Sequence, residues 1–360
     1  MYRQGHNGLL RTYSQAWRRC GVAGWIVAAL LIGFYVALYF TEAFDQVAQQ
    51  LGLRNRWFLY GALYCVAMTG GAIYYLKHHG ASRYNQLRIA TNLLVQIGVA
   101  FLLPFFMTVM GTKDFYFSYF WPLKIDYLYP GTILQYPFLI VLYSMLSVAL
   151  LVPLLAIFFG KRWYCSWVCG CGALANTFGD PWRHLTSKST RSWRVEQVSI
   201  HLVLGLALAT TAVVFINWGI GEDHPSFAAF AFEVQGWYGV IVGSVLAGVI
   251  GTGLYPLLGP RVWCRYFCPM AAMLGLVQKA GRFRVRVKDD MCISCGNCSA
   301  YCEMGIDVRA YAQTNQSFTR AACVGCGMCA HICPRGVLRL ESSWRRQPDK
   351  ARQGLSVLDI

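Results

Sequence analysis

Six apolar segments constrain this chain more than any other feature of its sequence. They lie at residues 21–40, 57–76, 89–110, 133–159, 198–220 and 237–258. A helix needs about 20 apolar residues to cross a hydrocarbon layer roughly 30 Å thick, and each segment is long enough. Charged residues make up 13% of the chain and the mean hydropathy is +0.40, whereas soluble proteins contain roughly 25% charged residues. We therefore predict a mostly α-helical protein built on a six-helix transmembrane bundle.

The positions of lysine and arginine predict how the bundle is oriented. Residues 1–20, 77–88, 160–197 and 259–360 hold 28 of the 32 lysines and arginines. Positively charged loops remain on the cytoplasmic side of a membrane. We therefore expect a multi-pass protein of the bacterial cytoplasmic (inner) membrane, with its N- and C-termini both in the cytoplasm. The net charge of +16 then reflects topology and contact with anionic membrane lipid, and we expect no nucleic-acid partner.

Two cysteine runs near the C-terminus share the spacing C-x2-C-x2-C-x3-C. They are Cys292, Cys295, Cys298 and Cys302, and then Cys323, Cys326, Cys329 and Cys333, the last followed by Pro334. Bacterial ferredoxins use this spacing to bind [4Fe–4S] clusters, and the fourth cysteine of each run ligates the other cluster. A zinc site would use four ligands, not eight interleaved ones.

This spacing predicts two [4Fe–4S] clusters in a small α+β domain of the bacterial-ferredoxin type. We assign the first cluster to Cys292, Cys295, Cys298 and Cys333, and the second to Cys323, Cys326, Cys329 and Cys302. The first run departs from the motif in one respect, because Glu303 stands where proline usually follows the fourth cysteine. This change concerns the local turn and leaves the ligands in place.

A second motif occurs once after the fourth apolar segment and once after the sixth. Both copies read G-x-R-x-(Y/W)-C-x-(W/Y)-x-C, at residues 160–169 and 259–268. The motif supplies the pairs Cys165 and Cys169, and Cys264 and Cys268. Two equivalent pairs at one membrane depth can provide four thiolates to one metal centre, and a third iron–sulfur centre is our leading interpretation. Redox-active disulfides and separate structural thiols are the alternatives.

Several residues near this repeat are further candidates. Cys171 occupies the position of Met270 in the second copy, so it is an extra thiol, either a resolving cysteine or a replacement ligand. We expect Arg162 and Arg261 to offset the negative charge of the thiolates. We expect residues 180–184 to form a solvated cytoplasmic loop, with a pocket for a quinone headgroup as the alternative.

Histidines and aromatic residues give weaker signals. We expect His78, His79 and His201 to lie at the level of the lipid headgroups, with binding of quinone or haem as the alternative. Residues 115–129 contain eight aromatic side chains, which we interpret as an aromatic belt at the membrane interface. A docking face for a periplasmic partner is the alternative for this loop.

The sequence divides the chain into five parts. We expect a basic cytoplasmic N-terminus (1–20), a transmembrane domain (21–259) with a cytoplasmic cysteine-rich loop (160–197), a segment carrying the second repeat and a cytoplasmic amphipathic stretch (260–285), a two-cluster ferredoxin domain (286–340) and a flexible tail (341–360).

These motifs together make the chain similar to the NosR/NapH family of membrane-bound polyferredoxins, over about residues 90–340. Members of that family have membrane helices, two C-x3-C-P motifs and a C-terminal two-cluster ferredoxin domain. Cys264, Cys268 and Pro269 match the second motif fully, whereas Gly170 follows Cys169 in the first. NosR-like proteins carry a flavin-binding domain before the membrane core. Here we expect any such extracytoplasmic redox domain to lie on a separate chain.

The resemblance implies one-electron transfer between a quinol pool or a cytoplasmic donor and an extracytoplasmic partner, either a flavoprotein or a cytochrome. In the NapH sense the protein would oxidise quinol as part of a quinol dehydrogenase, and in the NosR sense it would pass electrons outward. The alternative function is reduction of a metal such as copper, or assembly of a metalloenzyme, through the C-x3-C pairs, because soft thiolates select Cu(I). No motif predicts what carries electrons across the hydrocarbon layer.

Overall fold

The computed structural model describes residues 21–53, 55–220 and 224–344. The predicted basic N-terminus and residues 345–360 of the predicted tail lie outside this part of the chain. Of the remaining tail residues, 341 and 342 belong to strand β2 (Leu338–Ser342).

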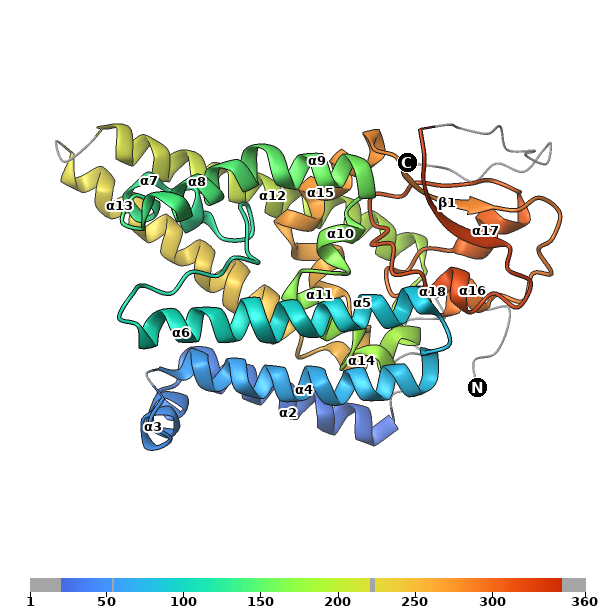
Figure 1. Ribbon diagram of the computed structural model, residues 1–360, viewed down its shortest axis with the longest axis horizontal. Helices are drawn as coiled ribbons and strands as arrows, with labels where there is room; N and C mark the ends of the chain where they lie inside the picture. The colour runs from blue at the N-terminus through green and yellow to red at the C-terminus, as the bar shows by residue number, and fades with distance from the viewer. Residues whose placement is uncertain (1–20, 54, 221–223, 345–360) are drawn as a thin grey trace.

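Within the described residues, six helices are long and apolar enough to cross a membrane (Figure 1). They are α2 (Gly21–Phe40), α4 (Arg56–His79), α5–η1–α6 (Arg83–Leu93, Leu94–Leu102 and Leu103–Val109), α8–η3–α9 (Phe138–Leu146, Ser147–Leu151 and Val152–Phe159), α12 (Thr190–Ile220) and α13–η6 (Pro225–Tyr238 and Gly239–Ile250). The stretches η1, η3 and η6 are π-helical. The predicted fold class, a mostly α-helical six-helix bundle with a small C-terminal strand region, is confirmed.

The sixth helix differs from the prediction at both ends. We predicted that it begins at residue 237 and ends at residue 258, but α13 begins at Pro225. Residues 225–232 are almost all apolar, and proline is favourable in the first turn of a helix. Glu233 lies within α13, and its side chain is exposed on the helix surface. The chain leaves the helix after Ile250 and turns into the short helix α14 (Tyr255–Leu258).

Both repeat segments fold back into the bundle. Gly160 and Gly259, the first residues of the two copies, end α9 and α14 with φ of +70° and +92°, a region that glycine adopts without a steric penalty. A Cβ on Gly160 would lie 2.6 Å from Phe283, and one on Gly259 would lie 2.2 Å from the Thr186 hydroxyl oxygen. The repeat therefore requires glycine both for its turn and for its close packing.

The helices after these turns lie between the spanning helices (Figure 1). They are α10 (Arg162–Cys165), α11 (Gly170–Asn176), η7 (Trp263–Phe267) and α15 (Pro269–Ala280), with η4 (Asp180–Leu185) following the first pair. We predicted a cytoplasmic cysteine-rich loop and a cytoplasmic amphipathic stretch here. In the structure, α11 packs against α4 and α5, and α15 packs between α9 and α12. Seven of the twelve α15 residues are buried, so this helix belongs to the core.

The aromatic loop also enters the bundle instead of forming a surface belt. It contains η2 (Ile125–Tyr127) and leads into α7 (Pro130–Ile133). Phe115, Phe120 and Tyr127 are at most 4% exposed, and the rings of Phe115 and Tyr127 stack with centroids 4.4 Å apart. The Tyr164 hydroxyl donates a hydrogen bond to the Ser118 carbonyl oxygen over 3.0 Å. The loop therefore reaches the first cysteine pair.

The C-terminal domain packs against one end of the bundle (Figure 1). Its strands β1 (Phe283–Val287) and β2 pair antiparallel, with Val285 opposite Leu340. Its helices are α16 (Asn297–Ala300), α17 (Val308–Gln313) and α18 (Met328–His331). At the opposite end of the bundle, a short helix, α3 (Ala43–Gln50), follows α2. The Ser166 hydroxyl donates to the Val324 carbonyl oxygen over 2.7 Å, which joins the first repeat directly to this domain.

The contact between α4 and the residues that follow α11 can be tested by substituting two adjacent glycines. A Cβ on Gly71 would lie 2.3 Å from the Phe178 backbone nitrogen, whereas one on Gly70 would meet nothing within 4 Å. We expect Gly71→Ala to destabilise the protein by about 1–3 kcal/mol because the backbone must move. Gly70→Ala is the control and should leave the midpoint of thermal unfolding in detergent unchanged or slightly raised. Equal midpoints for the two variants would contradict this packing.

Candidate iron–sulfur sites

The eight ferredoxin-type cysteines line two small cavities in the C-terminal domain. One cavity is lined by Cys292, Cys295, Cys298 and Cys333, and the other by Cys302, Cys323, Cys326 and Cys329. Each cavity therefore receives three thiols from one run and the fourth from the other run. In the described part of the chain no three histidine, cysteine, aspartate or glutamate side chains converge on a point that could hold one metal ion. Thiols that surround a hollow suit a cluster, so these residues fit [4Fe–4S] ligation.

The two loops that carry these thiols have the same backbone shape. Positive φ occurs at Ser294 and Gly296 in the first loop and at Gly325 and Gly327 in the second. These are the same two positions of the C-x2-C-x2-C pattern. Left-handed residues at these positions curl each loop around its cavity.

Backbone amides reach the fourth cysteine of each run in the same way. The Ile306 N–H donates to the Cys302 sulfur, and the Val337 N–H donates to the Cys333 sulfur, each over 3.4 Å. Such hydrogen bonds favour the thiolate and raise the reduction potential of a bound cluster. The two runs therefore build two similar sites related by an approximate internal repeat.

Burial alone would keep the Cys323 and Cys326 thiols protonated. It raises the pKa of Cys323 to about 12 and that of Cys326 to about 11. A coordinated metal provides the positive charge that deprotonates such thiols, so metal binding and thiolate formation are coupled.

The structure also brings together the four cysteines of the C-x3-C repeat. Cys165, Cys169, Cys264 and Cys268 are 4–6% exposed and belong to one buried cluster. All four interact electrostatically, which places the two pairs beside each other. Among the described cysteines, all are free thiols.

The second cysteine of each pair precedes a helix. Cys169 is the N-cap of α11 and Cys268 is the N-cap of α15. The Ala271 N–H donates to the Cys268 sulfur over 3.4 Å, and Gly172, at the equivalent position of the other copy, donates to Cys169. Amides at helix N-termini stabilise thiolates. The side chain of Cys171 forms a hydrogen bond with that of Cys169, so the extra thiol belongs to this site.

The cations beside this site are only partly those that we predicted. An Arg261 N–H donates to the Cys264 sulfur over 3.6 Å and to the Cys165 carbonyl oxygen over 3.1 Å. Arg162 is not beside these thiols, because it donates to the Ser342 hydroxyl and lies over the Phe283 ring. Lys161, which is fully buried, interacts electrostatically with Cys165. In the first copy of the repeat, the cation beside the thiols is therefore Lys161, one position before the predicted Arg162.

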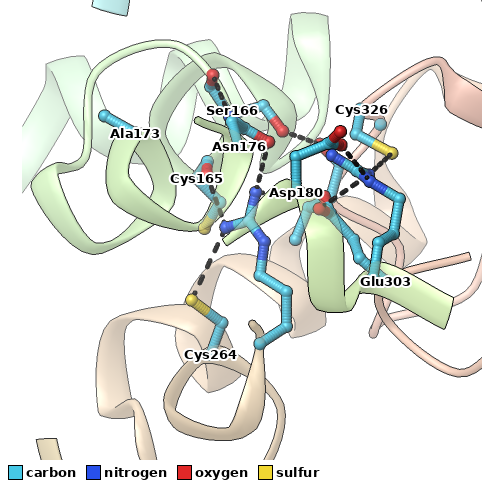
Figure 2. A network of polar contacts seen from close by, with 12 residues as sticks. Cys165, Ser166, Ala173, Asn176, Asp180, Cys264, Glu303 and Cys326 are labelled. Atoms are coloured by element: carbon cyan, nitrogen blue, oxygen red, sulfur yellow. Dashed lines mark hydrogen bonds and ion pairs between the residues drawn. The ribbon is translucent and has the colours of Figure 1, made fainter. Parts of the chain in front are cut away.

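A buried ion network connects the C-x3-C site to the ferredoxin-type domain (Figure 2). The Glu303 carboxylate, which has no exposed surface, lies 3.0 Å from a nitrogen of Arg261 and 2.8 Å from a nitrogen of Arg183. Arg183 also approaches the Cys326 sulfur to 3.9 Å. Burial would raise the pKa of Glu303, but the two guanidinium groups hold it below its ordinary value.

Further polar groups complete this network. Asn176 accepts hydrogen bonds from Arg261 over 2.8 Å and from the buried Arg88 over 2.7 Å. Asp180 lies 2.9 Å from Arg183 and 3.3 Å from His79. Asp180 and Arg183 are thus buried in ion pairs, which replaces our prediction that residues 180–184 form a quinone pocket or a solvated loop.

The remaining histidines of the prediction do not join the site. His78 and His201 are exposed, and each contacts the carbonyl oxygen four residues earlier in its own helix. Sequence reasoning missed Lys161, Arg88 and the role of Glu303. The one signal present in the sequence was the replacement of the expected proline by an ionisable residue at position 303.

Models of iron–sulfur protein families match the segments that contain both groups of cysteines. A 4Fe-4S dicluster domain matches residues 285–340, which contain the two ferredoxin-type runs. A 4Fe-4S binding domain matches twice, at residues 141–189 and 241–288. These two matches contain the two copies of the C-x3-C repeat.

The chain is also similar to curated proteins. It is 25% identical over 153 residues to YccM of Escherichia coli, a protein named for electron transport, covering 41% of this chain and 43% of YccM. It is 28% identical over 159 residues to the methylamine utilization ferredoxin-type protein MauN of Paracoccus denitrificans, covering 43% of this chain and 52% of MauN. It is 24% identical over 177 residues to the regulatory protein NosR of Pseudomonas aeruginosa, covering 47% of this chain and 23% of NosR.

The matched part of the chain thus spans about half or less of each of these relatives. No solved structure matches the chain.

The interleaved assignment of ligands can be tested with pairs of cysteine substitutions. Cys295→Ser combined with Cys333→Ser should remove about four irons per chain, because both residues line one cavity. Cys295→Ser combined with Cys302→Ser should remove about eight, because the two residues line different cavities. Cys65→Ser, in α4, is the control and should retain all iron. If the first pair lost eight irons and the second lost four, the assignment would be wrong.

The charge of Glu303 should influence the reduction potential of the neighbouring ferredoxin site. We expect Glu303→Gln to raise the midpoint potential by on the order of 60 mV, because removing a negative charge stabilises the reduced state. Potentiometric titration followed by EPR measures this shift. The control is Glu341→Gln, because Glu341 is partly exposed and pairs with Arg284 on the strand surface. Identical potentials for the two variants would contradict the proposed influence.

Proposed function

Because the chain is a NosR/NapH-like, ferredoxin-type iron–sulfur protein with six candidate membrane helices, we propose that it relays electrons across a membrane. The relay joins a quinol pool or a cytoplasmic donor to an extracytoplasmic redox partner on a separate chain. Two [4Fe–4S] clusters occupy the two ferredoxin-type cavities, and the C-x3-C cysteines hold a third iron–sulfur centre.

The residues of this chain hold and tune these centres. When bound, an iron–sulfur cluster accepts and releases one electron at a time. The cysteines fix its position, the amides of Ile306 and Val337 donate hydrogen bonds to sulfur, and the buried arginines compensate negative charge. These are the means by which a protein sets the reduction potential of a cluster.

One observation carries the proposal, namely the continuous line of contacts between the two groups of cysteines. It runs from the Cys326 sulfur to Arg183, Glu303 and Arg261, and ends at the Cys264 sulfur, with steps of 3.9, 2.8, 3.0 and 3.6 Å. Every residue between the two sulfurs is buried. A centre in the bundle would therefore lie close to the ferredoxin-type domain, with a rigid medium between them.

The depth of the C-x3-C site supports transfer across the membrane. The Tyr64 hydroxyl, in the outer half of α4, donates to the carbonyl oxygen of Gly170, next to Cys169, over 2.9 Å. Tyr64 lies eight residues from Arg56, the first residue of α4, which corresponds to about 12 Å along the helix axis. On the same outer side, the ring of Phe120 in the aromatic loop lies 5.5 Å from that of Tyr164.

The orientation of the protein follows from its charge distribution. With both termini in the cytoplasm, the ferredoxin-type domain faces the cytoplasm of a bacterial inner membrane and the aromatic loop faces the outside. The aromatic loop then forms the nearest protein surface between the C-x3-C site and an extracytoplasmic flavoprotein or cytochrome. The exposed apolar residues of the spanning helices contact membrane lipid.

A second candidate function rests on Cys171. Its side chain forms a hydrogen bond with that of Cys169, and two adjacent thiolates can bind Cu(I). Under this alternative, the C-x3-C pairs receive copper or another metal for reduction or for assembly of a metalloenzyme.

Anaerobic purification with iron and sulfide analysis tests the proposed relay. We expect about twelve irons per chain, of which about four are lost on Cys165→Ser or Cys264→Ser and none on Cys65→Ser. Quinol should reduce the iron–sulfur clusters of the wild-type protein and so bleach their visible absorbance. Tight copper binding in a ratio of one per chain, without bleaching by quinol, would favour the assembly function instead. A colourless, iron-poor preparation would contradict both iron–sulfur assignments.

A further inference from the structure

A cavity of about 690 Å³ lies inside the bundle between α2, α4, η1 and η6. Aromatic side chains form much of its wall, among them Tyr35, Trp57, Tyr60 and Tyr64. Its volume falls within the range of roughly 300–1,000 Å³ that is usual for small-molecule sites. The wall is thus suited to a flat, largely apolar ligand taken up from the membrane.

One end of this cavity lies against the C-x3-C site. Gly170 and Pro269 both line it, and each directly follows the second cysteine of its pair. Cys171 lines the cavity as well. Because consecutive Cα atoms are 3.8 Å apart, a ligand at this end lies next to residues that hold the proposed third centre.

Polar groups for binding a ligand are present in the same wall. A Cβ on Gly170 would lie 2.9 Å from the Gln96 side-chain oxygen and 3.3 Å from the Tyr119 hydroxyl. The absence of a side chain at position 170 therefore leaves these groups accessible from the cavity. The Tyr238 hydroxyl, in the same wall, is buried without a hydrogen-bond partner among the described residues. Hydroxyl and amide groups in this arrangement can bind the oxygens of a ligand ring.

The opposite part of the wall belongs to the aromatic loop and carries charge. Asp114, Lys124 and Asp126 line it there. The Lys124 ammonium lies 5.3 Å and 4.5 Å from the ring centroids of Tyr116 and Tyr127, and Asp126 accepts a hydrogen bond from Gln235. Two carboxylates on the outer side provide acceptors for protons that leave the cavity.

We infer that this cavity binds the ring of an isoprenoid hydroquinone, an inference that rests on the proposed relay. Such a molecule is planar and apolar, comes from the membrane, carries two hydroxyl groups and donates electrons. Its oxidation to the quinone breaks two O–H bonds and releases two electrons and two protons. Iron–sulfur clusters held by the cysteines would take up the two electrons one at a time, and the Asp114 and Asp126 carboxylates would accept the two protons and pass them to the outside.

A glycine in the cavity wall provides a way to fill the cavity without disturbing the thiols. Gly243, in η6, lines the cavity, and a Cβ added there would meet nothing within 4 Å. Gly205, in α12, is equally unobstructed but is not part of the wall. Gly243→Phe therefore tests the cavity, and Gly205→Phe is its matched control.

The experiment measures binding of a quinone analogue to the purified, iron-loaded protein in detergent. Titration with an apolar ubiquinone analogue, followed by quenching of tryptophan fluorescence, reports affinity directly, and photolabelling with an azidoquinone identifies the labelled peptides. We expect Gly243→Phe to weaken binding at least tenfold and Gly205→Phe to leave it unchanged. Tyr119→Phe should weaken binding roughly fivefold, as expected for the loss of one hydrogen bond. The label should appear on peptides from α2, α4 or η6.

The possible outcomes separate this inference from the proposed relay. Absence of binding, equal affinity of the Gly243→Phe and wild-type proteins, or labelling only at residues 180–184 would overturn the cavity assignment, whatever the iron content. Binding that Gly243→Phe abolishes while quinol fails to reduce the iron–sulfur centres would support the cavity and contradict electron entry from quinol. Iron content should be the same in all three variants, which shows that a loss of binding does not reflect a loss of folding.

Discussion

One buried carboxylate links the two halves of this protein through ion pairs. Glu303 has no exposed surface and lies between Arg183 and Arg261. Removing one partner from a buried ion pair typically costs 3–5 kcal/mol, because the other charge is left uncompensated. The network also contains Arg88 and Asp180, so its described members provide three guanidinium groups for two carboxylates. At the two ends of the network, Arg183 faces the Cys326 sulfur and Arg261 faces the Cys264 sulfur. Thiolates at these two positions would balance the surplus positive charge.

This network explains why the repeat segments fold inward instead of remaining at the membrane surface. A guanidinium group inside a membrane protein must be paired, and Arg261 finds its partners on Glu303 and Asn176. The glycines at 160 and 259 allow the chain to turn back, and the aromatic loop enters from the other side to meet Tyr164. The proposed path for electrons is thus shortened from both faces of the bundle, and the cavity beside Gly170 adds a point of entry within it.

The sequence predicted what depends on local pattern. Apolar length identified six helices, and cysteine spacing identified the residues that line each small cavity. The ion network was not predictable, because Arg88, Arg183 and Glu303 are far apart in the chain and no spacing rule relates them. The start of the sixth helix was misplaced because Glu233 interrupts the apolar run, although a helix can expose such a side chain on one side. The burial of the aromatic loop was missed because aromatic side chains suit both an interface and a core.

The central claim is that the bundle and the C-terminal domain hold iron–sulfur centres in close contact through Arg183, Glu303 and Arg261. Pulsed EPR of the fully reduced wild-type protein measures the magnetic interaction between such centres. We predict spectra broadened by coupling among three centres, including coupling between the centre at Cys264 and the centre at Cys326. Spectra that equal the sum of isolated, non-interacting clusters would contradict the account.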